Sequence, residues 1–216
     1  MDGKVQSYID HLVIGANSLE AGRNYVYQTL GIFPESGGVH TKMGTHNCLL
    51  KLGNSIYLEV IAANSDVPKP ERPRWFGLDE FFPDTKPRLL TWVVRTNQIN
   101  EALKKTNFSC GEIENMNRGN LEWLITVMRD RSMPMQGIAP TLIQWKNNLH
   151  PSDSLSESGC SLLRIEGYHP KEKVINEFLF SIGFEGEFRA NKQENDLKPS
   201  LIAYIETPKG IRKFIS

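Results

Sequence analysis

Cysteine is scarce in this chain. The three cysteines, Cys48, Cys110 and Cys160, are odd in number and widely separated, and no pair has the C-x-x-C spacing of a metal or redox motif. A disulfide framework is therefore not indicated. We expect three reduced thiols, which is typical of a cytoplasmic protein.

Net charge and long apolar runs are also lacking. Lysine plus arginine number 25 and aspartate plus glutamate number 25, so the formal net charge is zero. The sequence contains no basic patch of the kind that would predict binding to nucleic acid or to an anionic membrane surface. No run approaches 18 apolar residues, and the first residues, MDGKVQSYIDHL, do not resemble a signal peptide. The expected partner is a small organic ligand.

Three common catalytic motifs are missing. The chain contains no G-x-x-x-x-G-K-[ST], no G-x-G-x-x-G and no G-x-S-x-G. Nucleotide-phosphate binding and nucleophile-elbow hydrolase chemistry are therefore unsupported. The 216 residues, 39% of them hydrophobic, are nevertheless enough to bury a substantial core.

What the chain does contain is a repeated unit. Residues 1–63 predict a first β-α-β-β-β module, in which Asn17 or Ser18 caps the helix and Gly31 ends it. Residues 64–88 hold five prolines and predict a linker with one short helix. Residues 89–150 repeat the order strand, helix and three strands.

A third copy of the opening stretch predicts a partial module over residues 151–216. Shifting the opening stretch by 152 positions aligns Gly15 with Gly167 and Gly31 with Gly183, together with the apolar spacing around them. We expect this module to pack against the second module or to close a homodimer interface.

Three segments carry a resemblance to a known family. They read DHLVIGANSLEAG, GGVHTKMGTHNCLLKLGNSIYLEVIA and PTLIQWKNNLHP. The chain resembles the glyoxalase-like proteins of the vicinal oxygen chelate superfamily. The resemblance implies an α+β fold, in which paired β-α-β-β-β modules form an incomplete barrel around a pocket. One fold serves many reactions, so the chemistry must come from the site.

The resemblance also implies two metal-ligating positions, which here are His11 and Glu59. Antiparallel neighbours bring inward side chains together, and nitrogen and oxygen donors suit divalent metals. The second module offers Thr91 and Gln144 where two more ligands would stand. We therefore favour a pocket without a cofactor. If a divalent metal binds, His11 and Glu59 hold it; otherwise they form a polar pair.

His11, His40 and Glu59 are the predicted catalytic residues, since histidine titrates near neutral pH and a carboxylate can orient it. The expected activity is lyase or isomerase chemistry beside a carbonyl group. Lactoylglutathione lyase activity is not expected, because the second pair of ligands is missing. The alternative is a protein that binds and sequesters a small molecule without turnover.

Six further residues are predicted to contact the ligand. Tryptophans supply flat apolar walls, arginine binds carboxylates, and amides and histidines provide polar contacts. The residues are Asn47, Trp92, Arg118, Gln144, Trp145 and His150. The alternative is that the tryptophans pack in the hydrophobic core and that Arg118 is a solvent-exposed cation on the surface.

Overall fold

The computed structural model describes residues 4–147 and 149–216. The first module contains one helix and four strands. In chain order they are β1 (Ser7–Gly15), α1 (Leu19–Leu30), β2 (Glu35–His40), β3 (Thr45–Lys51) and β4 (Tyr57–Ala63), with the short 3-10 helix η1 (Thr41–Met43) after β2.

The second module has the same order of elements after a linker. The linker contains η2 (Trp75–Glu80), and the module comprises β5 (Arg88–Thr96), α2 (Ile99–Lys104), β6 (Glu112–Arg118), β7 (Leu121–Val127), η3 (Pro134–Gly137), β8 (Thr141–Trp145) and η4 (Pro151–Asp153). The C-terminal part comprises β9 (Ser161–His169), α3 (Glu172–Ser181), β10 (Phe184–Glu185), β11 (Phe188–Lys192), β12 (Ser200–Thr207) and β13 (Gly210–Ile215).

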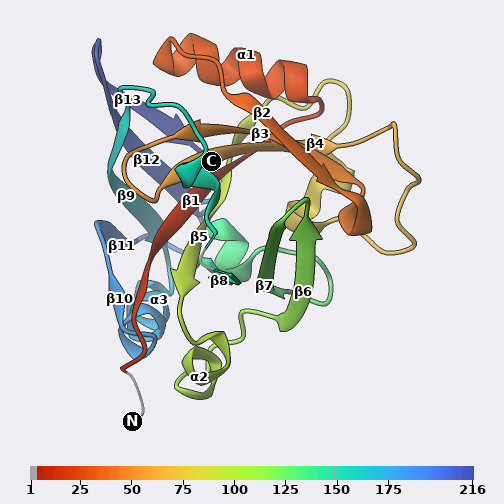
Figure 1. Cartoon of the computed structure of the whole chain (residues 1–216). Helices are drawn as coiled ribbons and strands as arrows, with labels where there is room; N and C mark the ends of the chain where they lie inside the picture. The colour runs from red at the N-terminus through yellow and green to blue at the C-terminus, as the bar shows by residue number, and fades with distance from the viewer. Residues whose placement is uncertain (1–3, 148) are drawn as a thin grey trace.

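The strands of both modules form one strongly curled sheet in the order β2-β3-β4-β1-β5-β8-β7-β6, and β10 pairs with β1. In Figure 1 the sheet bends from β2–β4 at the top, through β1 and β5, to β6 and β7 at the lower right. The result is a half-barrel with a concave inner face. The predicted α+β fold of paired modules is therefore confirmed.

Local sequence signals fix the first helix. The side chain of Ser18 accepts a hydrogen bond from the Ala21 amide, and Gly31 ends α1 in the left-handed conformation at φ 80°. Ser18, rather than Asn17, is the cap. The Gly22 position lies against Val60 of β4, and a Cβ there would approach the valine side chain to 2.3 Å. Glycine therefore lets α1 pack closely on the outer face of the sheet.

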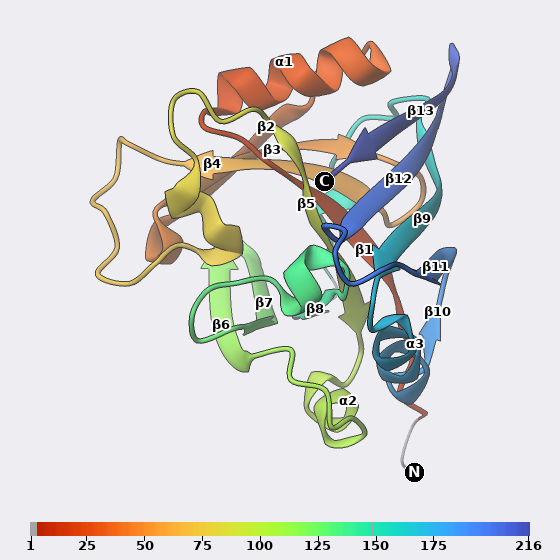
Figure 2. The same cartoon turned by 180° about the vertical axis from the view of Figure 1, so that it is seen from behind.

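The sheet separates two apolar clusters because successive strand residues point to opposite faces. Leu12 and Ile14 belong to the outer cluster, beneath α1 and the C-terminal part, whereas Val13 belongs to the inner cluster of the half-barrel. A second sheet, β11-β9-β12-β13, lies behind β1 and β5, as the reverse view in Figure 2 shows. The C-terminal part therefore covers the convex side of the barrel.

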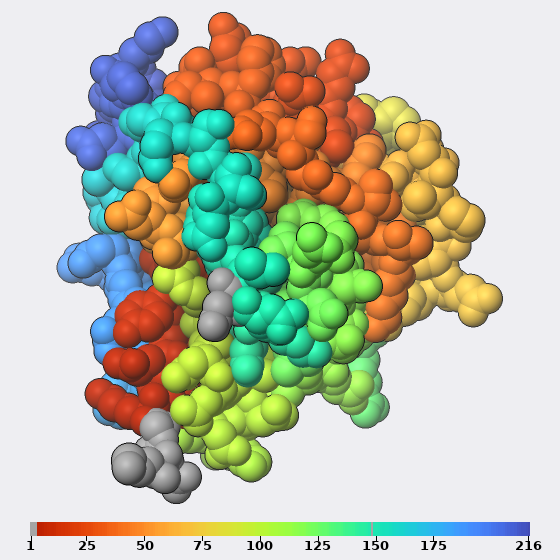
Figure 3. All heavy atoms as spheres, in the orientation of Figure 1, coloured from red at the N-terminus to blue at the C-terminus, as the bar shows by residue number. Residues whose placement is uncertain are grey.

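Two segments cover the openings of the half-barrel. The segment after β8 lies on the first module, where the Ser156 amide donates to Glu35 and the Ser158 hydroxyl donates to the Lys51 carbonyl. Figure 3 shows this segment in teal between the first module in orange and β6–β7 in green. On the other side, η2 places Trp75 and Phe76 in the inner cluster. Within residues 4–147 and 149–216, no helix has the length and apolarity to span a bilayer.

Candidate functional site

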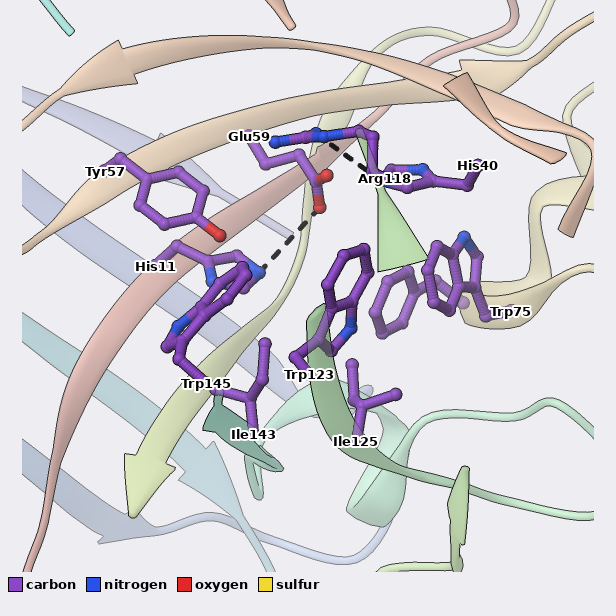
Figure 4. A pocket seen from close by; sticks show the side chains of 11 residues that line it. His11, His40, Tyr57, Glu59, Trp75, Arg118, Trp123, Ile125, Ile143 and Trp145 are labelled. Carbon is purple, nitrogen blue, oxygen red and sulfur yellow. Dashed lines mark hydrogen bonds and ion pairs between the residues drawn. The ribbon is translucent and has the colours of Figure 1, made fainter. Parts of the chain in front are cut away.

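A narrow cavity lies on the inner face of the half-barrel. The space open to the centre of a water molecule is about 20 Å³, which is room for about one water. Residues of both modules and of the linker line it, as Figure 4 shows: His11, His40, Tyr57, Glu59, Trp75, Phe76, Arg118, Trp123, Ile125, Ile143 and Trp145.

A β-bulge in β1 determines how the first polar group is built. Ile9 pairs with Val94 and His11 pairs with Val93, so Asp10 is an extra residue opposite one step of β5. The bulge cancels the usual alternation, and Asp10 contacts His11, its own neighbour, through a 2.6 Å bond between Oδ1 and Nδ1. The Asp10 side chain is fully buried.

Asp10 accepts two further hydrogen bonds. Trp145 Nε1 donates to Oδ2 at 2.8 Å, and His150 Nε2 lies 3.1 Å from the same oxygen. Burial acts to raise the pKa of Asp10, but the hydrogen bonds from His11 and His150 outweigh it and hold the pKa well below its ordinary value. An ionised carboxylate only accepts, so the Nδ1 atom of His11 carries a proton. The other ring nitrogen, Nε2, is then free to act in the cavity.

Glu59 is the second polar group at this position. Its Oε2 atom lies 3.8 Å from His11 Nε2, which is too long for a direct hydrogen bond. Its Oε1 atom accepts from the Asn47 side chain at 2.5 Å. The ring of Tyr57 stacks on His11 with centroids 4.5 Å apart. His11 Nε2 and Glu59 Oε2 thus lie side by side at the cavity, where a water or a substrate atom next to the pair can contact both.

Arg118 and His40 form the other polar side of the cavity. Arg118 Nη1 donates to Asn47 Oδ1 at 2.7 Å and lies 3.5 Å from His40 Nε2. A Cβ at Gly38 would approach the Arg118 side chain to 2.7 Å, so glycine makes room for it. Among the described residues, no carboxylate lies within ion-pair distance of Arg118. Its positive charge is therefore available to an anionic ligand.

His40 is uncharged in the folded protein. Burial and the charge of Arg118 lower its pKa to about 3. Its Nδ1 atom lies 3.1 Å from the Thr45 hydroxyl. Since both ring nitrogens already face partners, His40 is better placed to hold Arg118 than to accept a proton from a substrate.

Aromatic rings form the remaining walls. Trp123 and Trp145 lie 5.3 Å apart between centroids, and Trp75 meets His40 edge-on at 5.1 Å. Phe76 stacks beside Trp75 at 5.5 Å. The cavity therefore combines a polar end, at His11, Glu59 and Arg118, with an apolar aromatic surface.

Comparison with known proteins identifies the family. The sequence profile of the glyoxalase-like domain matches residues 9–181, which is more than half of the chain. The chain belongs to the glyoxalase-like domain family. No curated protein sequence matches it.

Solved structures are similar to this glyoxalase-like domain at low sequence identity, and the two with a TM-score above 0.5 share its fold. A hypothetical protein from Staphylococcus aureus is 14% identical, with a TM-score of 0.59 over 87% of this chain and 86% of that chain. A 4-hydroxymandelate synthase mutant from Streptomyces coelicolor is 10% identical, with a TM-score of 0.52 over 97% of this chain and 62% of that chain. A Mn(II)-bound glyoxalase from Novosphingobium aromaticivorans is 9% identical, with a TM-score of 0.44 over 96% of this chain and 81% of that chain.

The glyoxalase-like domain brings most of the sequence-predicted residues together. His11, His40, Glu59, Arg118 and Trp145 line the cavity. Two others support these residues from behind. Asn47 bridges Glu59 and Arg118, and His150 binds the carboxylate of Asp10.

Two predicted ligand-binding residues lie elsewhere, which corrects the sequence-based expectation. Trp92 belongs to the outer cluster, where it stacks on Phe188 at 4.4 Å and donates to the Ile138 carbonyl. Gln144 accepts from the Ile99 amide at the start of α2. Both residues are on the face of their strand opposite the cavity, because Val93 and Ile143 occupy the inner face.

Six residues of the cavity lining, and Asp10 beside it, were not among the predicted site residues. The six are Tyr57, Trp75, Phe76, Trp123, Ile125 and Ile143. Tyr57 is two positions before Glu59, so strand periodicity could have indicated it. Asp10 could not be inferred in this way. Regular alternation would place it on the other face of the strand from His11, and only the bulge turns it inward. Trp75 and Phe76 come from the linker, whose path is set by long-range contacts.

A resident divalent metal would need His11 and Glu59 as ligands. The Asp10–His11 contact is of the kind that often supports a metal-bound histidine. However, catalytic metal sites usually have three protein ligands. Among the described residues, no group of three or more His, Cys, Asp or Glu side chains could hold a metal ion. His11 and Glu59 therefore supply two of the three protein ligands that are usual at a catalytic metal, and they are the residues that would hold one.

Proposed function

We propose that this glyoxalase-like domain is an enzyme that moves a proton at a carbon beside a carbonyl or carboxylate group of a small organic acid. The observation that carries the proposal is the facing pair of His11 Nε2 and Glu59 Oε2, 3.8 Å apart in a buried cavity, with Asp10 on the other nitrogen of the imidazole. This is the arrangement of an oriented general base with a charged partner.

The chain's own groups account for each part of the reaction. His11 Nε2 takes the proton from carbon, and the resulting imidazolium is stabilised by the carboxylates of Asp10 and Glu59. The electron pair left on carbon moves to the adjacent carbonyl oxygen. Arg118 supplies the positive charge beside that oxygen, since no carboxylate of the described residues pairs with it. Delivery of the proton from Nε2 to a different carbon or to the oxygen gives an isomerisation. If Nε2 first trades its proton with water, return to the same carbon gives exchange with solvent.

Tyr57 helps to keep this geometry. Burial, together with the nearby charges of Asp10 and Glu59, raises the pKa of Tyr57 well above its ordinary value. The ring therefore stays neutral and apolar where it stacks on His11. Stacking fixes the plane of the imidazole, so Nε2 keeps its direction toward Glu59.

The test is exchange of carbon-bound hydrogen with solvent. A panel of small 2-oxo acids and carboxylic acids is incubated with the protein in D₂O, and deuterium incorporation is followed by NMR. We expect His11→Gln and Glu59→Gln to slow exchange by on the order of 10²-fold or more. His46→Gln, outside the cavity lining, is the matched control and should keep the wild-type rate. Exchange that survives His11→Gln would contradict the proposal.

The aromatic walls favour a second candidate, which is binding without turnover. Trp123, Trp145 and Trp75 offer flat apolar surface next to one cationic group, and such a site can retain an amphipathic ligand. In the same panel, a compound that quenches tryptophan fluorescence but gains no deuterium would support binding alone.

A further inference from the structure

The cavity at His11 and Glu59 is too small for a complete organic substrate. Its volume of about 20 Å³ holds about one water, whereas ligand pockets usually offer hundreds of cubic ångströms. A reacting group can enter it after displacing water, but the rest of the molecule must extend beyond it. The question is where the remainder lies.

Two further cavities continue from the first along β7. A second cavity of about 10 Å³ shares Trp75, Phe76 and Ile125 with the first. A third, an open groove of about 530 Å³, shares Met128, Ser132 and Pro134 with the second. The shared residues are walls between neighbouring cavities, so the three spaces lie in one row from His11 to the surface, separated by side chains such as Phe76 and Met128.

The groove at the end of this row has a mixed lining, in which flexible apolar side chains lie beside polar ones such as Gln136 and Asn195. Met128, Met133 and Met135 are part of the lining, and Phe108 and Leu197 add further apolar surface. Methionine is flexible and suits variable apolar ligands. The titratable groups in the lining are His169 and Lys171, so none of the lining residues is acidic.

We propose that this row of cavities is a tail subsite for an elongated substrate. The acidic, reacting end lies at Arg118 and His11, and an unbranched apolar chain passes beneath Phe76 and leaves through the methionine-lined groove. This inference rests on the proposed function, because it takes Arg118 as the group that binds the acidic end. It names the substrate class as a carboxylic acid, or a related carbonyl compound, with a long alkyl tail.

The probes are straight-chain carboxylates from butanoate to dodecanoate, titrated into the full chain with tryptophan fluorescence as the readout. The dissociation constant should fall by at least about tenfold between butanoate and decanoate, because each added methylene leaves water for an apolar wall. Arg118→Met should weaken binding of every member of the series. A series with no gain in affinity beyond the shortest acids overturns the tail subsite.

A bulky label attached to the folded protein tests whether the alkyl tail runs from the second cavity into the groove. Ser132 is exposed and lines both the second cavity and the groove, so Ser132→Cys can be labelled there with a bulky maleimide. The native thiols are buried, with Cys48 4%, Cys110 1% and Cys160 5% exposed, so they should not compete. The label should abolish the gain from chain length but leave butanoate binding unchanged. Labelled Ser65→Cys, on an exposed part of the linker, is the matched control.

The outcomes separate the two proposals. If butanoate binds through Arg118 but chain length has no effect, or if the Ser132 label leaves the chain-length gain intact, the tail subsite is overturned and the proposed function stands. If no carboxylate binding depends on Arg118, both fail together. If the Ser132 label instead dissociates a dimer, the groove belongs to a second copy of the chain, and the tail subsite is overturned.

Discussion

Replacing Asp10 by Asn tests the central polar network. The buried carboxylate accepts from His11 at 2.6 Å and from Trp145 at 2.8 Å, and it lies 3.1 Å from His150 Nε2. Hydrogen bonds to a charged group contribute about 1.5–3 kcal/mol each. Asn keeps one acceptor oxygen but turns an N–H₂ group toward the other donors.

We therefore expect the free energy of unfolding to fall by about 1.5–3 kcal/mol in Asp10→Asn, because at least one buried donor loses its charged acceptor. Relief of the cost of burying a carboxylate offsets part of the loss, which favours the lower end. Urea denaturation at pH 7 measures the change. Asp153→Asn, at an exposed position in η4, is the control and should change stability by less than about 0.5 kcal/mol.

The same substitution makes a pH-dependent prediction. Because the pKa of Asp10 is lowered in the folded state, its stabilisation is complete above its ordinary pKa of 3.8 and is lost as the pH falls below that value. The difference in unfolding free energy between wild type and Asp10→Asn should therefore shrink between pH 5 and pH 2. A difference below about 1 kcal/mol at pH 7, or one that grows in acid, would refute the network described for Asp10.

Three further predictions follow from individual contacts. With the pKa of His40 at about 3 in the folded protein and 6.5 as its ordinary value, the unfolded chain binds a proton there first, so stability should fall by several kcal/mol as pH drops from 6.5 to 3. His40→Gln should flatten that part of a urea-denaturation series, and an unchanged slope would count against a buried neutral His40. Because the Trp92 side chain is fully buried, Trp92→Leu should lower the free energy of unfolding by about 2–4 kcal/mol in a denaturation experiment. Carboxylate binding should be unchanged, and weakened binding would show that Trp92 contacts the ligand. Added Mn²⁺ or Zn²⁺, and EDTA treatment, should leave both the deuterium-exchange rate and the melting temperature unaltered, and metal-dependent exchange would show that His11 and Glu59 recruit a cation after all.

The sequence was sufficient to predict the α+β fold of paired modules. Helix α1 has its cap at Ser18 and its end at Gly31, and the same glycine recurs 152 positions later as Gly183, which has φ 61° at the end of α3. These signals are local, because they depend on hydrogen bonds and backbone angles within a few residues. The chain's membership of the glyoxalase-like family confirms the predicted fold.

The pair His11 and Glu59 could also be predicted, since each lies on a strand and the resemblance puts both on the inner face. The structure brings them to 3.8 Å. The sidedness of the tryptophans could not be decided in the same way. Trp92 and Trp145 both follow a polar residue in a strand, yet Trp92 packs on the outer face and Trp145 donates to Asp10 on the inner face.

Only the tertiary structure determined how the site is completed. The alternation of strand side chains has a period of two, and a single bulge at Asp10 resets it without a signal in the residues themselves. The linker residues Trp75 and Phe76 reach the cavity through contacts with distant strands. The sequence by itself therefore determined the elements and the two facing catalytic candidates. The orienting carboxylate and the aromatic cover were decided by pairing between distant strands, because no local pattern encodes which residues such pairing brings together.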